Sequence, residues 1–386
     1  MRVLLLILSV AATAPAFYVR FSGASVSAPL QAAVFGVAVL GAALLLSWAT
    51  ETAEHEISRS LAMAALALVA ILPEYAVDIY FTWTSAVQPA YREFALANMT
   101  GANRLLVGVG WPLVVLVHAG RRRLGIRIEH PQRTEAAFLA AATVYAAVIP
   151  LKGSLTLVDS LVLLAIFALY VRRSAGDESE ETALFGPAAL IGEMGRWSRR
   201  AAILAIFAFA AVVVLVSAEP FADSLVATGR SLGWNEFLLV QWIAPLASEA
   251  PELVIALVWT LRRRPHAGFS ALLSSKVNQW TLLVGSIPVA YSLHLGRAAV
   301  FPLAGRQIDE MWLTVAQSLL AVVLLLDDDL GIGESLLLLG LYAAQVFLPE
   351  VRMTESVVYA VLAAGILLAR RREAWPFLRS GLSARR

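Results

Sequence analysis

Two Pro-Glu pairs lie deep inside long apolar segments, one in each half of the chain. They are Pro73-Glu74 and Pro251-Glu252, and each is followed about 30 residues later by the run Leu-Leu-Val-Gly. An ionised carboxylate inside a bilayer is costly, so it usually faces a cavity, a partner or an ion. Two carboxylates at equivalent points of an internal duplication therefore predict a cation site formed by both halves.

The prolines are expected to supply further oxygen ligands. Proline lacks the N–H that would bond the carbonyl four residues back, so Pro73 should release the carbonyl of Val69. By the same argument Pro251 should release that of Ala247. Hard cations take oxygens from carboxylates, carbonyls and amides. The alternative is that each Pro-Glu starts a helix, which fits a single copy better than two copies well inside apolar runs.

Helical spacing places more polar side chains near the two glutamates. Asp78 lies four residues after Glu74, and Glu249 lies three before Glu252, so each pair can share one helix face. Two basic residues, Arg104 and Lys276, also fall in apolar segments, and they leave the four acids a formal charge of minus two. The predicted cation-binding residues are Glu74 and Glu252, which are also the candidate metal ligands, then Glu249, Asp78, Asn103, Ser248 and Asn278.

Composition indicates a membrane protein. Hydrophobic residues make up 59% of the 386 residues and charged residues only 15%, whereas soluble domains are about a quarter charged. A net charge of +2 gives no reason to expect nucleic acid as a partner, and the absence of cysteine excludes disulfides and thiolate metal sites. The expected partners are the lipid bilayer and inorganic cations, with no cofactor; the sequence does not predict an oligomeric state.

Twelve apolar stretches approach the length of about 20 residues that a helix needs to cross a bilayer. The predicted helices cover residues 3–18, 28–50, 60–84, 94–119, 134–150, 155–171, 200–218, 236–261, 268–294, 311–327, 334–349 and 355–370.

The distribution of basic residues supports this count. With alternate loops assigned to opposite faces, one face collects 21 Lys and Arg residues and the other 7. Cytoplasmic loops hold the excess, so both termini are predicted to be cytoplasmic. The expected location is a prokaryotic plasma membrane. The first segment also has features of a cleavable signal peptide, but the charge distribution fits better if it is retained as a helix.

Three motifs of the second half come in a fixed order. They are Ala-Glu-Pro-Phe-Ala-Asp-Ser-Leu-Val at 218–226, Gly-Trp-Asn-Glu-Phe-Leu at 233–238 and Ala-Ser-Glu-Ala-Pro-Glu-Leu-Val at 247–254. The first half repeats the pattern more weakly at 72–78 and 98–107. This arrangement resembles the alpha repeat of the calcium/cation antiporter superfamily, the sodium/calcium exchanger membrane-region family.

The resemblance implies an all-α polytopic fold with about 12 transmembrane helices, in which an inverted pair of five-helix repeats carries one extra helix at each end. Inverted repeats are a known architecture of secondary transporters, with the substrate site near the membrane midplane. The expected divisions are an N-terminal helix at 1–27, the first repeat at 28–172, a cytoplasmic linker at 173–199, the second repeat at 200–350, and a C-terminal helix with a basic tail at 351–386.

Departures from the family pattern bear on the transported ion. Ala70 and Ile71 stand where the family has hydroxyl residues before the first Pro-Glu, while Glu249 brings a carboxylate to such a position in the second repeat. Aligned on Leu-Leu-Val, Lys276 takes a serine position and Trp280 that of the last asparagine, unless a gap moves Asn278 there. Lys276 either forms a structural salt bridge or places its ammonium in a cation subsite, so that fewer ions move per cycle.

The expected function is secondary active cation antiport by alternating access, exchanging Ca²⁺ or Na⁺ against Na⁺ or H⁺. Two alternatives stay open: a Na⁺(K⁺)/H⁺ antiporter that does not carry calcium, and a non-transporting membrane protein derived from an exchanger. An intramembrane metalloenzyme is disfavoured because the five histidines are scattered, and His55-Glu56 lacks a second histidine at zinc-protease spacing.

Overall fold

The computed structural model describes residues 2–53, 72–122, 125–174, 184–348 and 352–382. These residues form two compact units, each assembled from separate stretches of chain. Unit 1 contains Met1–Thr84 and Glu178–Pro251, and unit 2 contains Ser85–Asp177 and Glu252–Arg386. Each unit therefore combines parts of both halves of the sequence.

Helices dominate both units, as an apolar environment requires, because a helix satisfies its backbone hydrogen bonds internally. Among the described residues, eight helical segments are long and apolar enough to cross a membrane. The chain is therefore an integral membrane protein. These segments are Arg2–Ser22, Ala28–Ala53, Tyr91–Gly120, His130–Lys152, Arg196–Leu232, Glu236–Leu261, Arg306–Asp327 and Arg352–Ala369.

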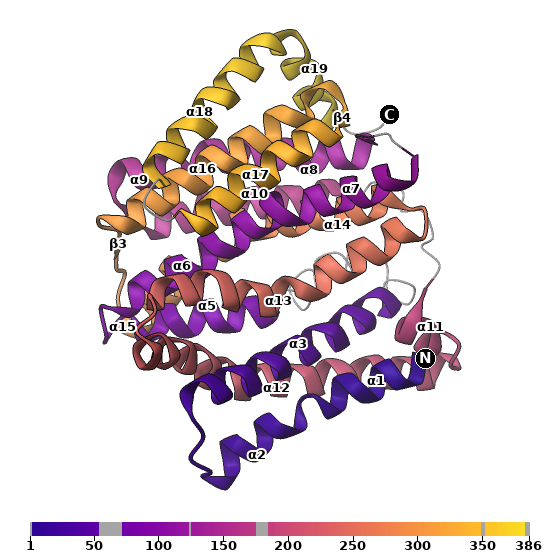
Figure 1. Cartoon of the computed structure of the whole chain (residues 1–386), viewed down its shortest axis with the longest axis vertical. Coiled ribbons are helices and arrows are strands. Elements are labelled where there is room, and N and C mark those ends of the chain that lie inside the picture. The colour runs from indigo at the N-terminus through magenta and orange to yellow at the C-terminus, as the bar shows by residue number, and fades with distance from the viewer. Residues whose placement is uncertain (1, 54–71, 123–124, 175–183, 349–351, 383–386) are drawn as a thin grey trace. The chain divides into compact units, whose positions relative to one another are not determined.

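Unit 1 is organised around two long helices that lie side by side (Figure 1). Gly36 allows their close packing, because a Cβ there would come within 2.9 Å of the Phe221 ring. The elements of unit 1 are α1 (Arg2–Ala11), α2 (Ala14–Ser22), α3 (Ala28–Ala53), α5 (Leu72–Thr84), α11 (Gly186–Gly192), α12 (Arg196–Leu232) and the part of α13 (Glu236–Leu261) up to Pro251. The two long helices are α3 and α12.

Helix α12 is longer than the sequence predicts. The expected helix ended at residue 218, but α12 runs for 37 residues, continues through Pro220 and ends where Gly233 adopts a left-handed conformation. A proline is tolerated inside a membrane helix when its surroundings satisfy the freed backbone groups. The linker differs as well, because it contains α11 and because α12 already begins at Arg196.

Unit 2 contains the remaining elements. They are α6 (Tyr91–Leu105), the π-helix η1 (Leu106–Gly110), α7 (Trp111–Arg122), β1 (Ile126–Arg127), α8 (His130–Ala146), α9 (Val148–Lys152), β2 (Ser154–Leu155), α10 (Leu157–Ser174), the rest of α13, α14 (Pro265–Asn278), the π-helix η2 (Gln279–Leu283), α15 (Val284–Leu295), β3 (Phe301–Pro302), α16 (Arg306–Leu324), the 3-10 helix η3 (Leu325–Asp327), β4 (Asp329–Leu330), α17 (Ile332–Phe347), α18 (Arg352–Ala369) and α19 (Arg371–Leu382).

The short strands reveal the duplication within unit 2. β3 and β4 each begin 175 residues after β1 and β2, and β1 pairs antiparallel with β4 while β2 pairs with β3. The amide of Ile128 bonds the carbonyl of Asp328 at 2.8 Å, and the amide of Leu303 bonds that of Gly153 at 2.9 Å. Asp328 and Gly153 both have φ of 64°. Equivalent loops thus make the same contacts with exchanged partners, as two-fold pseudosymmetry requires.

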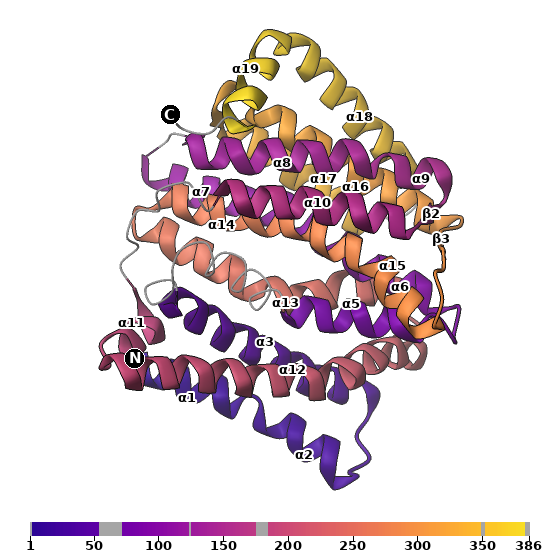
Figure 2. The same cartoon turned by 180° about the vertical axis from the view of Figure 1, so that it is seen from behind.

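The helices of unit 2 exchange partners in the same way. α8 packs on α14 and α6 packs on α16, while α10 packs on α15 and α7 on α17; Figure 2 shows α8 and α10 in the first repeat. The glycine of each Leu-Leu-Val-Gly run serves one of these contacts. A Cβ on Gly108 would come within 2.3 Å of the Tyr342 ring, and one on Gly285 within 3.3 Å of Leu163.

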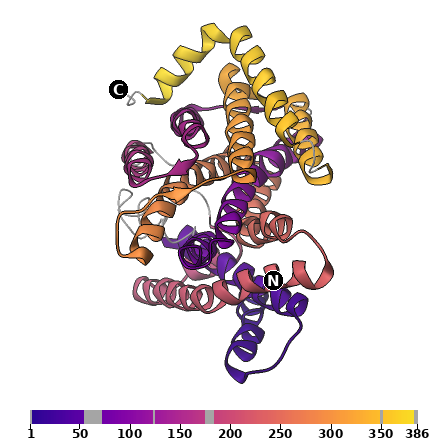
Figure 3. The same ribbon diagram turned by 90° about the vertical axis from the view of Figure 1, so that its left-hand side faces the viewer.

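The part of the chain after α18 (Arg352–Ala369) was expected to be a basic tail, but it forms a further helix, α19 (Arg371–Leu382). The chain turns sharply from α18 into α19 (the two yellow helices of Figure 3). α18 packs on α16 and α19 packs on α8, the equivalent helices of the two repeats. At the turn Arg370 forms ion pairs with Asp327 at 2.5 Å and Glu334 at 2.9 Å.

Other predicted helices agree with the structure to different degrees. The helix expected at 236–261 is α13, and Pro251 lies in its interior, so the helix-start explanation is wrong for this copy. The first expected helix is two helices, α1 and α2. For the helix expected at 60–84 only α5 is described, and Val69, Ala70 and Ile71 lie outside the described residues.

Candidate functional site

In unit 1 the first Pro-Glu belongs to α5. Glu74 and Asp78 lie one turn apart on this helix, and both are almost fully buried, with exposed fractions of 2% and 1%. Their shared face agrees with the spacing argument. α5 packs on α12, where the Tyr80 hydroxyl donates a hydrogen bond of 2.8 Å to Asp223. Asp223, the aspartate of the 218–226 motif, therefore helps to fix the helix that carries Glu74.

The second Pro-Glu lies on α13, and the boundary between the units falls between Pro251 and Glu252. Glu249 and Ser248, in unit 1, are buried. The Ser248 hydroxyl donates to the carbonyls of Ala244 and Pro245 at 3.2 and 3.3 Å, so its proton is engaged within its own helix while its oxygen keeps acceptor capacity.

Glu252, on the unit 2 side of this boundary, is partly buried. Ala256 lies one turn after Glu252 on α13. Gly268 of α14 packs closely against it, since a Cβ on Gly268 would come within 2.4 Å of the Ala256 carbonyl oxygen. This close approach positions the start of α14 against the helix that carries Glu252.

The described residues of unit 2 contain two π-helical segments, one in each repeat. η1 begins three residues after Asn103, and η2 begins three residues after Lys276. π-helical turns are rare and often occur at functional sites. Counted from the π-helical segments, Lys276 takes the position that Asn103 has in the first repeat, whereas the 175-residue offset of the strands pairs Asn103 with Asn278.

Lys276 and Asn103 contact each other directly. The Lys276 ammonium donates to the Asn103 backbone oxygen at 2.8 Å and to its Oδ1 at 3.0 Å. Both side chains are essentially fully buried, and the ammonium also lies 5.2 Å from the centre of the Trp280 ring. Asn103 was predicted to offer its oxygens to a mobile cation; in the structure a fixed cation of the protein already binds them.

The remaining polar groups of these segments have different roles. Trp280, placed by sequence register at an asparagine position, donates its indole N–H to Thr143 at 3.0 Å. It is a buried residue with a structural role. Asn278 is buried at the end of α14, with an exposed fraction of 6%, and its Oδ1 accepts no hydrogen bond from a described residue.

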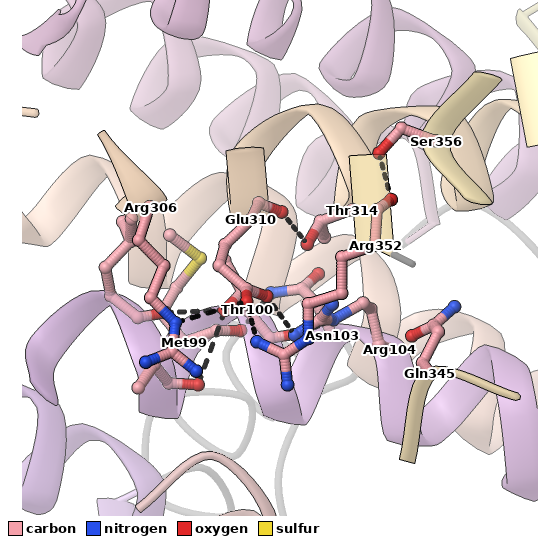
Figure 4. Close-up of polar contacts among 12 residues, drawn as sticks. Met99, Thr100, Asn103, Arg104, Arg306, Glu310, Thr314, Gln345, Arg352 and Ser356 are labelled. Atoms are coloured by element: carbon pink, nitrogen blue, oxygen red, sulfur yellow. Dashed lines mark hydrogen bonds and ion pairs between the residues drawn. The ribbon is translucent and has the colours of Figure 1, made fainter. Parts of the chain in front are cut away.

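Arg104 does not have the role that the sequence suggested. It was expected to offset the predicted cation-binding acids, but its guanidinium forms a buried ion pair of 2.6 Å with Glu310 on α16. Glu310 also pairs with Arg352 of α18, and Arg306 lies 4.0 Å away (Figure 4). The predicted formal charge of minus two therefore included Arg104, although Glu310, an acid outside the predicted site, neutralises it.

Sequence reasoning missed Glu310, Arg352 and Glu355. All three lie near the starts of apolar runs, where charged residues usually sit at the membrane surface. The structure buries each of them, with exposed fractions of 1%, 7% and 5%. A signal was available in the helix spacing, because Arg352 and Glu355 are three residues apart and can face the same neighbour.

Among the described residues, no group of three or more His, Asp or Glu side chains is arranged to hold a metal ion. The candidate ligands are instead a few buried carboxylates accompanied by amide and carbonyl oxygens. Such oxygen-only ligands suit hard cations, which include Na⁺ and Ca²⁺.

Comparison with known proteins identifies the family. The profile of the family described as sodium/calcium exchanger protein matches residues 27–175 and 202–349. The chain belongs to the sodium/calcium exchanger family. It is accordingly an exchanger-type cation antiporter, and its inverted five-helix repeats are the architecture that the sequence resemblance implied. No protein in the curated set matched the chain.

Solved structures extend the comparison. A structure described as the H⁺/Ca²⁺ exchanger CAX is 41% identical to this exchanger, has a TM-score of 0.94, and the match covers 98% of this chain and 97% of the other. The Ca²⁺/H⁺ antiporter YfkE is 16% identical with a TM-score of 0.64, covering 95% and 99%. The sodium-calcium exchanger NCX_Mj is 19% identical with a TM-score of 0.54, covering 82% and 98%. The last two share the fold.

Proposed function

We propose that this exchanger moves Ca²⁺ across the membrane in exchange for H⁺. The observation that carries the proposal is the similarity to the H⁺/Ca²⁺ exchanger CAX, at 41% identity over 98% of the chain. Buried carboxylates suit both ions, since a carboxylate binds a hard divalent cation when ionised and a proton when neutral.

Glu74 and Glu252 are the proposed cation-binding residues. Each belongs to a Pro-Glu pair, and Pro251, inside α13, is expected to leave the carbonyl of Ala247 as a further oxygen. Each ionised carboxylate carries one negative charge, which can be balanced by a proton or can serve as a ligand to Ca²⁺. Binding one or the other, but not both, is the competition that antiport requires. Asp78, Glu249, Ser248 and Asn278 are proposed as supporting oxygen donors.

Lys276 is proposed to set the number of ions carried. Its ammonium binds the two Asn103 oxygens, which are the kind of ligand a hard monovalent cation would take. A cation covalently attached to the protein cannot leave during the cycle. We therefore expect no mobile Na⁺ at this point, which favours Ca²⁺/H⁺ exchange over exchange driven by Na⁺.

Reconstitution of the purified chain in liposomes tests the proposal. A pH gradient should drive Ca²⁺ uptake, and a Ca²⁺ gradient should drive proton movement in the opposite direction, both without Na⁺. Proton movement driven only by Na⁺ or K⁺ would support a monovalent cation/proton antiporter. The absence of any coupled flux would indicate a non-transporting relative of the exchangers.

A further inference from the structure

A buried cluster of charges connects the C-terminal helix to α6 within unit 2. Its centre is Glu310 on α16, which pairs with Arg104 of α6 at 2.6 Å, with Arg352 of α18, and with Arg306 at 4.0 Å. Figure 4 shows the guanidinium groups converging on this one carboxylate. Three arginines around one glutamate carry an excess of positive charge, which a second ionised acid would reduce.

Glu355 is the second acid. It lies one turn after Arg352 on α18, its side chain is about 95% buried, and neither carboxylate oxygen accepts a hydrogen bond from a described residue. Arg104, Arg352 and Glu310 are close enough to interact electrostatically with it. On the other side of the cluster, Nη1 of Arg104 likewise donates no hydrogen bond within the described part of the chain.

The groups around Glu355 act on its charge in opposite directions. Arg104 from α6 and Arg352 from α18 favour the ionised form, whereas Glu310 from α16 opposes it. Burial without hydrogen bonds also opposes it. The Tyr359 phenol on α18 is another titratable neighbour of Glu355, and it accepts a hydrogen bond from Gln345 at 2.8 Å. The Tyr342 phenol on α17 lies near Tyr359 and Arg104.

The cluster adjoins the Lys276–Asn103 contact through the backbone of α6. Arg104 directly follows Asn103, and its carbonyl accepts a hydrogen bond from Gln317 of α16 at 3.4 Å. Its guanidinium is held by Glu310. A change in how Arg104 is shared between two acids would therefore act on the helix turn whose oxygens bind Lys276.

We propose that Glu355 is a regulatory proton site, separate from the transported ions. When Glu355 is ionised, Arg104 and Arg352 are shared between two carboxylates. When it binds a proton, both arginines depend on Glu310 alone, and α18 is held less strongly against α16 and α6. A change in pH thereby alters how α18 holds the segment that carries Asn103, and α18 itself takes no part in ion exchange.

Infrared difference spectroscopy of the purified protein, titrated with acid in detergent, tests this directly, because a protonated buried carboxyl gives its own C=O band. The Glu355→Gln variant should lose one buried-carboxyl transition that the unmodified chain shows. Glu373→Gln, which alters an exposed acid on α19, is the matched control and should keep it. An identical set of transitions in all three proteins would overturn the proposal.

Glu355→Asp keeps the experiment decisive if the glutamine variant does not fold. Its carboxyl is one methylene shorter and sits differently against the arginines, so the same band should appear with a shifted midpoint. An unshifted midpoint would assign the band to another acid and reject the proposal. The spectra need no transport, so they remain informative even if Ca²⁺/H⁺ exchange is disproved.

Discussion

Asn103 and Lys276 occupy matching positions before the two π-helical segments and bind each other. Sequence reasoning identified both residues, because an intramembrane lysine is conspicuous and Asn103 precedes the Leu-Leu-Val run. It could not identify their contact. Side-chain spacing gives the depth of a residue along its own helix, but not which residue of the other repeat faces it.

Lys276→Ser tests the role of the fixed ammonium. We expect this variant to leave the Asn103 oxygens open to a mobile cation, so that Ca²⁺ transport becomes dependent on Na⁺ and at least about tenfold slower in its absence, which corresponds to about 1.4 kcal/mol. Lys152→Ser is the control, since Lys152 is the only other lysine in the chain and pairs with Asp159 on α10. Unchanged ion selectivity in liposome flux assays would reject the role.

Glu310 is the residue whose loss should most affect stability. Glu310→Gln leaves Arg104 buried opposite a neutral group, and removing one member of a buried ion pair typically costs about 3–5 kcal/mol. Thermal unfolding in detergent should therefore show a large drop in midpoint. Asp309→Asn, at the neighbouring and more exposed position, should change it little. Equal midpoints for the two variants would show that the cluster adds nothing to stability.

At the scale of helices, sequence periodicity and hydropathy located nearly every apolar element. The bounds of α13 agree fully, because charged and glycine-containing loops flank it. The helix predicted at 200–218 was too short, because α12 continues through Glu219 and Pro220, where it packs on α3 and α5. α19 was missed because its arginines dominate the composition, while the contact of Gly381 with the carbonyl of Arg133 is visible only in three dimensions.

Close packing at the Leu-Leu-Val-Gly runs makes a specific prediction. Gly108→Ala should force Tyr342 to move, because the new Cβ would lie 2.3 Å from its ring, and overpacking of this kind costs about 1–3 kcal/mol. Gly340→Ala, on the helix that carries Tyr342, meets no atom within 4 Å and should be neutral or slightly stabilising. Thermal unfolding of both variants decides; a stable Gly108→Ala would contradict the packing argument.

At the scale of the whole molecule, the duplication together with the family resemblance predicted inverted repeats. In the structure the repeats are visible in unit 2, where each strand of one repeat pairs with a strand of the other: β1 with β4 and β2 with β3. The compact units could not be predicted, because each combines stretches from both repeats. Contacts distant in sequence decide such a division, and local patterns do not report them.

Orientation in the membrane stays a prediction of the arginine distribution. Both termini should face the cytoplasm, because 21 basic residues are assigned to that side and 7 to the other. The chain has no cysteine, so single cysteines placed before Arg2 and after Arg386 can be labelled with an impermeant maleimide. Both should stay unlabelled in intact cells and react after lysis. Labelling of either one in intact cells would contradict the assigned orientation.

The most direct test of the central claim is coupled flux with Glu252→Gln. In liposomes with a pH gradient and no Na⁺, the unmodified chain should accumulate Ca²⁺ while protons leave. Glu252→Gln should abolish both movements, because an amide neither exchanges protons nor matches the charge of Ca²⁺. Glu193→Gln, which alters an exposed acid paired with Arg2, should leave both intact. Undiminished Ca²⁺/H⁺ exchange by Glu252→Gln would contradict the account.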